Sequence, residues 1–292
     1  MTSEAPTIAL LGTGTMGLPV GQNLLKAGLP LRAWNRNPDK AAPLADAGAT
    51  IAASPGDAVS GADIVITMLY DADSVAEVMT QAKDRFAPST TWIQLTTVGV
   101  AGAQRLADLA GELGLVYVDS PVLGTKKPAE DGALVVLAAG PDEARPTCQP
   151  VYDAVGSRTI WLSRPGDASK LKLVANAWVI AVLEGIAESL TLAGALGLDP
   201  GLFLEAVKGG AMDAPYVQLK GSTMIAGDWT PSFGLSNADK DARLILQAAR
   251  SAGIDMAITQ AAHDYFTQAI EAGHGDKDLS AILLAHQGGR GS

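Results

Sequence analysis

The chain has 292 residues, of which 48% are hydrophobic and 18% are charged. This length and composition predict two domains of ordinary size with buried cores, and they argue against intrinsic disorder. The formal net charge of −10 excludes a broadly basic surface, so neither nucleic acid nor an anionic membrane is an expected partner.

The first half of the chain alternates short apolar runs with helical stretches. The predicted strands are residues 7–11, 31–35, 50–52, 63–69, 92–95, 116–119 and 134–139. Helices are predicted at 18–27, at 38–47 and from Pro55, which follows Ser54 as the N-cap. Strands separated by helices of this length indicate βαβ units and a parallel sheet, as in a Rossmann-type doubly wound α/β domain.

Helical periodicity dominates after about Gly166. The predicted helices are residues 169–196, 200–208, 238–252, 256–272 and 278–286. We therefore expect an α/β domain over residues 1–165 and an all-helical domain over residues 166–292. The apolar stretch 174–198 contains Glu184 and Glu188, which favours a buried or interface helix over a membrane span. With no basic region at residues 1–6, a cytoplasmic protein is expected.

A glycine-rich sequence follows the first predicted strand and opens the first predicted helix. Gly12, Thr13, Gly14, Thr15, Met16 and Gly17 form a G-x-G-x-x-G motif in a βαβ unit. The first glycine permits the tight turn, the second lets the backbone approach a pyrophosphate, and the third lets the helix pack on the strand. Free N–H groups at the helix N-terminus favour the phosphates. This loop, with Thr15 and Met16, is the predicted dinucleotide site.

The end of the second strand bears on which dinucleotide is preferred. An NAD-type domain places Asp or Glu about 20 residues beyond the glycines, to bind the ribose hydroxyls. Asn35 and Arg36 stand there instead, and no carboxylate occurs until Asp39. A guanidinium pairs well with a 2′-phosphate, so NADP(H) is preferred over NAD(H). The alternative is that Arg36 is a solvated surface arginine.

Lys172 and Asn176 are the candidate catalytic residues. They lie four residues apart on a predicted helix and therefore project from one face. Apolar neighbours disfavour the ammonium form of Lys172 and favour acid/base chemistry. The alternative is a lysine whose stem is covered and whose ammonium reaches solvent, and the pattern alone does not decide. One cysteine, Cys148, and three distal histidines predict no disulfide and no metal site.

Four motifs in order carry a resemblance to a known family. They are residues 9–17, Asn35-Arg36, Gly166…Lys172…Asn176 and Phe233…Lys240-Asp241. Together they resemble the β-hydroxyacid dehydrogenases, which include 3-hydroxyisobutyrate dehydrogenase and tartronate semialdehyde reductase. The resemblance covers nearly the whole chain. It implies that a long helix joins the Rossmann-type domain to the helical domain, and that two subunits form a homodimer through their helical domains.

The resemblance also implies roles for single residues. Lys172 would be the general acid/base, and Asn176 would hydrogen-bond the substrate. Thr97 matches the family's threonine near the nicotinamide, and Lys240 matches a lysine that faces the cofactor and the active site. Met68-Leu69 matches the loop after the fourth strand, although Tyr70 replaces the usual proline.

The substrate loop departs from the family pattern. The implied substrate-binding residues are Val122, Leu123, Gly124 and Thr125. Leu123 stands where the family has a serine that holds the substrate's carboxylate, and Thr125 and Pro128 stand where it has glycines. Leucine donates no side-chain hydrogen bond. We therefore expect a larger or less polar carbonyl compound rather than a small hydroxy acid, with Thr125 or Lys126 as a substitute donor.

The sequence thus predicts an NADP-dependent oxidoreductase acting on a hydroxy acid or a related alcohol/carbonyl pair. An imine reductase of the same architecture is the first alternative, and Lys172 argues against it because such enzymes usually have another residue there. A non-catalytic, cofactor-binding regulatory protein is the second. Retention of both Lys172 and Asn176 argues against that alternative.

Overall fold

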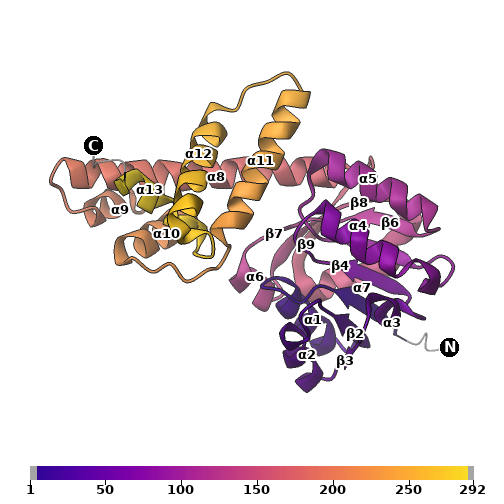
Figure 1. The fold of residues 1–292 in the computed structure, drawn as a ribbon. Coiled ribbons are helices and arrows are strands. Elements are labelled where there is room, and N and C mark those ends of the chain that lie inside the picture. Colours follow the sequence, from indigo (N-terminus) through magenta and orange to yellow (C-terminus); the bar gives the residue numbers. More distant parts are fainter. Residues whose placement is uncertain (1–4, 289–292) are drawn as a thin grey trace. The chain divides into compact units, whose positions relative to one another are not determined.

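The computed structural model describes residues 5–288 (Figure 1). They form two compact units, which divide after Lys172. The first is α/β and the second is helical, which confirms the predicted fold class. Helix α8 (Asp167–Ala195), salmon in Figure 1, begins in the first unit and continues into the second. The boundary expected at residue 165 lies two residues before this helix, whereas the division between the units falls within it.

The first unit contains one sheet in the order β3-β2-β1-β4-β5-β6-β8-β7, with β9 also paired to β8. Its strands are β1 (Ile8–Leu11), β2 (Leu31–Trp34), β3 (Thr50–Ile51), β4 (Ile64–Thr67), β5 (Thr91–Gln94), β6 (Val116–Asp119), β7 (Val122–Leu123), β8 (Leu134–Ala139) and β9 (Gly156–Leu162). The strands from β1 to β6 pair in parallel and have the strand order of a dinucleotide-binding domain. Strand β8 runs antiparallel to β6 and β7.

Helices cover both faces of this sheet, so successive strand residues alternate between two buried cores. Ile8 and Leu10 of β1 belong to one core, and Ala9 and Leu11 to the other. The first core includes α1 (Gly17–Lys26), α2 (Ala42–Asp46), α6 (Lys126–Glu130) and α7 (Arg145–Val155). The second includes α3 (Pro55–Val59), α4 (Ala72–Gln81) and α5 (Gly99–Glu112). Burial on both faces explains the continuous apolar runs in the strands.

The predicted elements differ from the structure at several places. The expected helix 38–47 is a 3-10 turn, Pro38–Lys40, followed by α2. Strands β7 and β9 were not predicted, because β7 has two residues and β9 begins with the polar sequence Gly-Ser-Arg. The Ser54 cap is confirmed, since its Oγ accepts a hydrogen bond from the Asp57 N–H at 3.1 Å.

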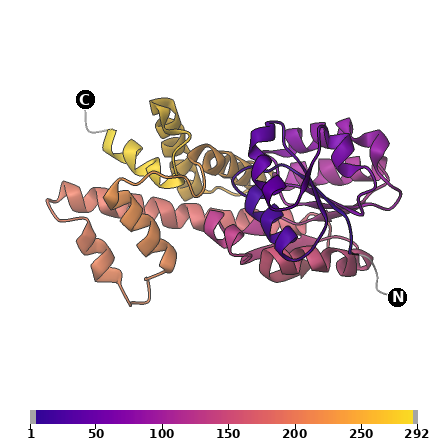
Figure 2. The ribbon, with the colours of Figure 1, turned by 90° about the horizontal axis from the view of Figure 1, so that it is seen from below.

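The second unit is built around the part of α8 that follows Lys172. The other helices are α9 (Gly201–Val207), α10 (Pro215–Ala226), α11 (Leu235–Ser251), α12 (Ala257–Ala269) and α13 (Ile282–Gly288). Figure 2 shows α9 beside α10, and these two helices are in contact. Helix α10 was not predicted from the sequence.

Helix α8 is the one helix within residues 5–288 that is long and apolar enough to cross a membrane. Its residues Leu183, Ile186 and Ala187 are buried in the helical unit's core. Glu184 is also buried, with Oε1 3.0 Å from Nε2 of His286 on α13. A carboxyl group buried against a histidine of the same unit is a property of a core helix rather than of a lipid-facing one.

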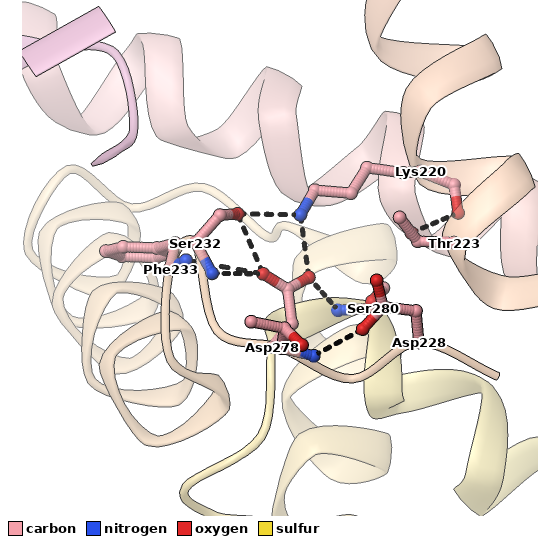
Figure 3. Close-up of polar contacts among 8 residues, drawn as sticks. Lys220, Thr223, Asp228, Ser232, Phe233, Asp278 and Ser280 are labelled. Carbon is pink, nitrogen blue, oxygen red and sulfur yellow. Dashed lines mark hydrogen bonds and ion pairs between the residues drawn. The ribbon is translucent and has the colours of Figure 1, made fainter. Parts of the chain in front are cut away.

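A buried ion pair ties α10 to the segment before α13 (Figure 3). Lys220 Nζ lies 2.6 Å from Asp278 Oδ1, and both side chains are almost fully buried. Asp278 also accepts hydrogen bonds from the Ser232 N–H at 2.9 Å and the Ser280 N–H at 3.0 Å. Burial by itself raises the pKa of Asp278, but the ammonium and these donors outweigh it and lower the pKa to about 2.

Cys148 lies on α7 with its side chain in the first core. Burial raises the pKa of its thiol to about 11, against a smaller lowering by a hydrogen bond with Tyr152. The thiol is therefore protonated at neutral pH and a poor nucleophile.

Candidate active site

Several predicted cofactor residues lie at the carboxyl edge of the sheet, directly after strand residues that pair with one another from strand to strand. The row of paired residues crosses β2, β1, β4, β5 and β6 through Trp34, Leu11, Thr67, Gln94 and Asp119. Asn35, Gly12 and Met68 come directly after three of these residues. Crossovers leave β1 in opposite directions, toward β2 and β4, so this edge is the switch point at which doubly wound sheets bind ligands.

The glycine loop has the geometry that a pyrophosphate requires. Gly12 has φ +107°, and a Cβ atom there would overlap with the carbonyl oxygen of Met68. A Cβ on Gly17 would overlap with the carbonyl oxygen of Gly12, whereas a Cβ on Gly14 would meet nothing within 4 Å. The loop is thus closed on the protein side and open at Gly14. The Thr13 hydroxyl is buried without a hydrogen-bond partner in the described part of the chain. These features fit a bound dinucleotide.

Asn35 joins the end of β2 to this loop. Its Oδ1 accepts a hydrogen bond from the Thr13 N–H at 3.0 Å, and its Nδ2 donates to the Asn37 carbonyl at 2.9 Å. The neighbouring Arg36 is exposed, and within residues 5–288 it makes no hydrogen bond or ion pair. The asparagine therefore has a structural role, and the guanidinium is available at the place where a ribose would lie.

Hydrogen bonds from Gln94 and Thr96 hold the loops after β4 and β5, and neither residue was predicted as part of the site. Gln94 Nε2 donates to the Thr96 carbonyl at 2.8 Å, and Gln94 Oε1 accepts from the Thr96 N–H at 2.6 Å. Thr96 Oγ1 in turn accepts from the Leu69 N–H at 2.9 Å. This chain of bonds holds Leu69 beside the turn that leads to Thr97. The sequence signal that could have identified Gln94 and Thr96 is the presence of polar residues at the end of an apolar strand.

The predicted substrate-binding residues form a short strand and the turn after it. Val122 is buried, and Leu123 is half-buried among apolar side chains that include Ala168 and Leu171 of α8. Gly124 has φ +127°, and a Cβ there would lie 2.7 Å from Leu134 Cδ2. Thr125 occupies the N-cap position of α6 without a side-chain cap bond. The structure thus turns Val122 into the core and sets Leu123 against the start of α8.

Asp119 connects the same loop to α8 and was absent from the predicted site. Its Oδ2 accepts a hydrogen bond from the Ser169 N–H at 2.8 Å, and its Oδ1 accepts from the Ser169 hydroxyl at 2.9 Å. Burial raises the pKa of Asp119 to about 6, although the two bonds from Ser169 act in the opposite direction. Lys172 is half-buried and lies three residues beyond Ser169 in the same helix.

The remaining predicted residues gather inside the helical unit. Asn176 Nδ2 donates to Asp241 Oδ2 at 2.7 Å, and Lys240 Nζ lies 3.0 Å from Asp241 Oδ1. All three side chains are buried. Asp241 accepts one of the two hydrogen bonds that the Asn176 amide can donate and thereby orients this side chain. Within the described residues, no group of three His, Cys, Asp or Glu side chains has the geometry for a metal ion.

Two known family patterns match the sequence of this chain, one over each of its two parts. The sequence pattern of the NAD binding domain of 6-phosphogluconate dehydrogenase matches residues 7–163. The pattern described as the NAD-binding part of NADP-dependent 3-hydroxyisobutyrate dehydrogenase matches residues 166–285. The chain belongs to the β-hydroxyacid dehydrogenase family. It is an NAD(P)-dependent oxidoreductase of the class that acts on CH–OH groups.

Relatives within the family match over almost the whole chain. Glyoxylate/succinic semialdehyde reductase 2 of Arabidopsis thaliana is 33% identical over 96% of this chain and 79% of its own. Reductase 1 of the same plant is 31% identical over 95% of this chain and 97% of its own. A structure of Mycobacterium tuberculosis 3-hydroxyisobutyrate dehydrogenase with L-serine is 27% identical, with a TM-score of 0.86 over 96% of this chain and 99% of its own.

Two further similarities bear on the alternative functions. An imine reductase from Myxococcus stipitatus in complex with NADP⁺ is 22% identical, with a TM-score of 0.67 over 97% of this chain and 100% of its own, and shares the fold. Human cytokine-like nuclear factor N-PAC is 27% identical over 98% of this chain, which spans about half of that protein. The architecture therefore also occurs in proteins that carry other functional names.

Proposed function

We propose that this protein is an NADP(H)-dependent reductase and dehydrogenase of the 3-hydroxyisobutyrate type that uses Lys172 as its general acid/base. It would interconvert a hydroxy acid or related alcohol with the matching carbonyl compound. The observation that carries this proposal is the attachment of α8 to the carboxyl edge of the sheet through Asp119 and Ser169, one turn before Lys172. The glycine loop lies at that same edge.

The nicotinamide of the bound cofactor supplies or accepts a hydride. Lys172 Nζ would protonate the carbonyl oxygen of the substrate in reduction and accept the hydroxyl proton in oxidation. Asn176 would hydrogen-bond the substrate, while one N–H of its amide donates to Asp241 and orients the side chain. Lys240, beside Asp241, would add positive charge that favours an anionic group of the cofactor or substrate.

The preference for NADP(H) is supported by the exposed guanidinium of Arg36. With no carboxylate between Arg36 and Asp39, nothing nearby repels a 2′-phosphate. We expect NADPH to be used at least about tenfold more efficiently than NADH, and Arg36→Ala to remove most of that difference. Steady-state kinetics with both cofactors tests this. Equal use of the two by the native enzyme, or an unchanged preference in the variant, would contradict it.

The substrate class is suggested by Leu123 and by the names of the relatives. The plant relatives are reductases of glyoxylate and succinic semialdehyde. Leu123 packs against an apolar cluster that includes Ala168 of α8, so we propose a carbonyl substrate with an apolar part next to the reacting carbon. NADPH oxidation should be compared for glyoxylate, succinic semialdehyde and longer-chain aldehydes or keto acids. Efficient turnover of 3-hydroxyisobutyrate or tartronate semialdehyde would contradict this proposed substrate class.

Lys172→Ala tests the chemistry itself. We expect kcat to fall by at least about a hundredfold while NADPH still binds, because the general acid is lost and the glycine loop is untouched. Binding is followed by the fluorescence of NADPH. Activity that survives in the variant would remove the mechanism. Turnover of imines but not carbonyls would favour an imine reductase, and NADPH binding with no turnover of any substrate would favour a regulatory protein.

We further propose that the protein acts as a homodimer in the cytoplasm. Support for the dimer comes from apolar side chains exposed on the helical unit, among them Val174, Trp178, Ile254 and Ile258. Trp178 is 71% exposed in the single chain, which is unusual for a tryptophan. Sedimentation of the native protein and of Trp178→Glu tests the dimer. A native monomer, or a variant that dimerises as tightly as the native chain, would contradict this assignment.

A further inference from the structure

The first turn of α8 has no capping side chain of its own. Its first helical hydrogen bond runs from the Lys170 N–H to the Gly166 carbonyl at 3.1 Å, so Gly166 occupies the N-cap position. Gly166 has φ +79° and no side chain to offer. The carboxylate of Asp167 lies 2.9 Å from Lys170 Nζ. The unsatisfied N–H groups of this turn therefore need an acceptor from elsewhere.

Asp119 supplies that acceptor from the end of β6. Its carboxylate binds both the N–H and the hydroxyl of Ser169, the third residue of the helix. An acceptor at the third N–H is the usual contact of an N-cap side chain, and a negative charge there also favours the helix dipole. Asp119 is 0% exposed and Ser169 is 2% exposed, so water does not replace either bond.

The capped turn is the one that leads directly into the catalytic candidate. Ser169 and Lys172 are three residues apart, a spacing that puts them on neighbouring positions of one helix face. Asp119 itself is fixed in the sheet by pairing with Gln94 of β5 and Ala139 of β8. Any shift of the helix along its axis or about it would therefore have to break the bonds between Asp119 and Ser169.

We infer that Asp119 is a positioning residue, which caps α8 from outside the helix and thereby fixes Lys172 Nζ at the carboxyl edge of the sheet. This inference rests on the proposed role of Lys172. The Asp119 carboxylate is hydrogen-bonded to Ser169, so its effect on the reaction would pass through the helix. A loss of position of about 1 Å is enough to lower a rate constant by about a hundredfold.

The titratable side chains that face Asp119 come from two elements. Tyr117 belongs to β6 and Tyr152 to α7, and burial raises the pKa of both phenols well above their usual value. Both are therefore neutral across the working range of pH. Ser169 on α8 is neutral as well. An effect of pH that disappears when Asp119 is replaced by asparagine would thus belong to the Asp119 carboxyl group.

The experiment compares Asp119→Ala, Asp119→Asn and Ser169→Ala with a matched control, Ser120→Ala. Ser120 is the next residue on the chain and is fully buried, and its hydroxyl lies 2.5 Å from the Tyr152 hydroxyl rather than near α8. The control therefore loses a buried hydrogen bond without touching the helix. Asparagine keeps an acceptor for the Ser169 N–H and adds a donor for its hydroxyl.

We expect kcat to fall about thirtyfold in Asp119→Ala and several-fold in Ser169→Ala, with KM for NADPH changed less than about twofold. Asp119→Asn should restore kcat to within about threefold of the native enzyme at pH 8. Any decline of the native rate below about pH 6 should stay within the same threefold, because a protonated Asp119 keeps an acceptor as asparagine does, and it should be absent from Asp119→Asn. Amide hydrogen exchange at residues 168–172 should rise in Asp119→Ala and stay unchanged in Ser120→Ala.

Equal losses of kcat in Asp119→Ala and Ser120→Ala would overturn the inference, as would unchanged exchange at residues 168–172. If Asp119→Ala does not fold, Ser169→Ala decides by the same comparison with the control. The proposed function fails separately, through Lys172→Ala that remains active. In that event the exchange measurement still tests the cap.

Discussion

Two buried aspartates hold the start of a helical segment, one in each unit, and they do so with opposite electrostatics. Asp119 binds the first turn of α8 with only neutral donors around it, the N–H and hydroxyl of Ser169. Asp278 binds the Ser280 N–H at the turn before α13 and also the ammonium of Lys220 (Figure 3). Burial raises the pKa of Asp119 to about 6, whereas the pKa of Asp278 falls to about 2.

The difference shows how strongly one neighbouring cation changes the pKa of a buried aspartate. Burial favours the neutral acid in both cases, and hydrogen bonds from neutral groups offset only part of that effect at Asp119. The ammonium beside Asp278 reverses the balance. One aspartate is therefore a permanent structural charge, while the other loses its charge just below neutral pH, next to the proposed acid/base of the reaction.

The largest expected effect comes from breaking the ion pair. Asp278→Ala should lower the free energy of unfolding of the helical unit by about 3–5 kcal/mol, because it leaves the Lys220 ammonium buried without its counter-ion. Lys220→Met should cost less, since the backbone N–H groups of Ser232 and Ser280 still hold the carboxylate. Urea unfolding followed by circular dichroism measures both. A larger decrease in the free energy of unfolding for Lys220→Met than for Asp278→Ala would contradict this explanation of the ion pair.

A smaller effect is expected at the neutral cap. Asp119→Ala should cost about 1–3 kcal/mol, because the buried N–H of Ser169 loses its acceptor. Asp119→Asn should cost less than about 1 kcal/mol, since the amide preserves the bonds and avoids the burial of a charge. The same unfolding measurement applies. If asparagine proves as costly as alanine, the charge and not the hydrogen bonds stabilises the cap.

The smallest effect is a difference in pH dependence. The folded state raises the pKa of Asp119 and so binds its proton more tightly than the unfolded chain does. Its contribution to stability is therefore full below about pH 4 and is lost as the pH rises through about 6. Between pH 7 and pH 5 the native protein should gain about 1 kcal/mol relative to Asp119→Asn.

Asp278 should behave in the opposite way. Its lowered pKa makes its contribution full above about pH 4 and lost as the pH falls toward 2. A paired series of native protein, Asp119→Asn and Asp278→Asn, unfolded at several pH values, separates the two contributions. Parallel pH curves for the native protein and Asp119→Asn would show that the carboxyl group of Asp119 does not titrate in this range.

The parts of the fold that depend on a local sequence pattern could be predicted from the sequence. Strands with both faces buried are visible as continuous apolar runs. Gly12 and Gly17 mark the predicted cofactor loop, because a Cβ atom on either one would overlap with a backbone carbonyl oxygen. The missed elements lack such signals. Strand β7 is too short for a pattern, and β9 begins with polar residues.

The missed contacts join residues that are distant in sequence. Asp119 and Ser169 are 50 residues apart, and Lys220 and Asp278 are 58 apart. No periodicity relates such residues, because only the folded sheet and helices bring them together. Lys172 was proposed from its apolar neighbours and from the family resemblance, whereas the aspartate that caps its helix is visible only in three dimensions.

The deep position of Cys148 has a practical consequence. The chain contains one cysteine, and its buried thiol stays protonated at neutral pH. The native sequence is therefore a ready background for site-directed labelling, since maleimides and nitroxide reagents attack exposed thiolates. A cysteine introduced at an exposed position in each unit, such as Glu112 and Met212, would carry the two labels alone. Distances between such labels, measured with and without NADPH, would show whether the separation of the two units in solution changes when the cofactor binds.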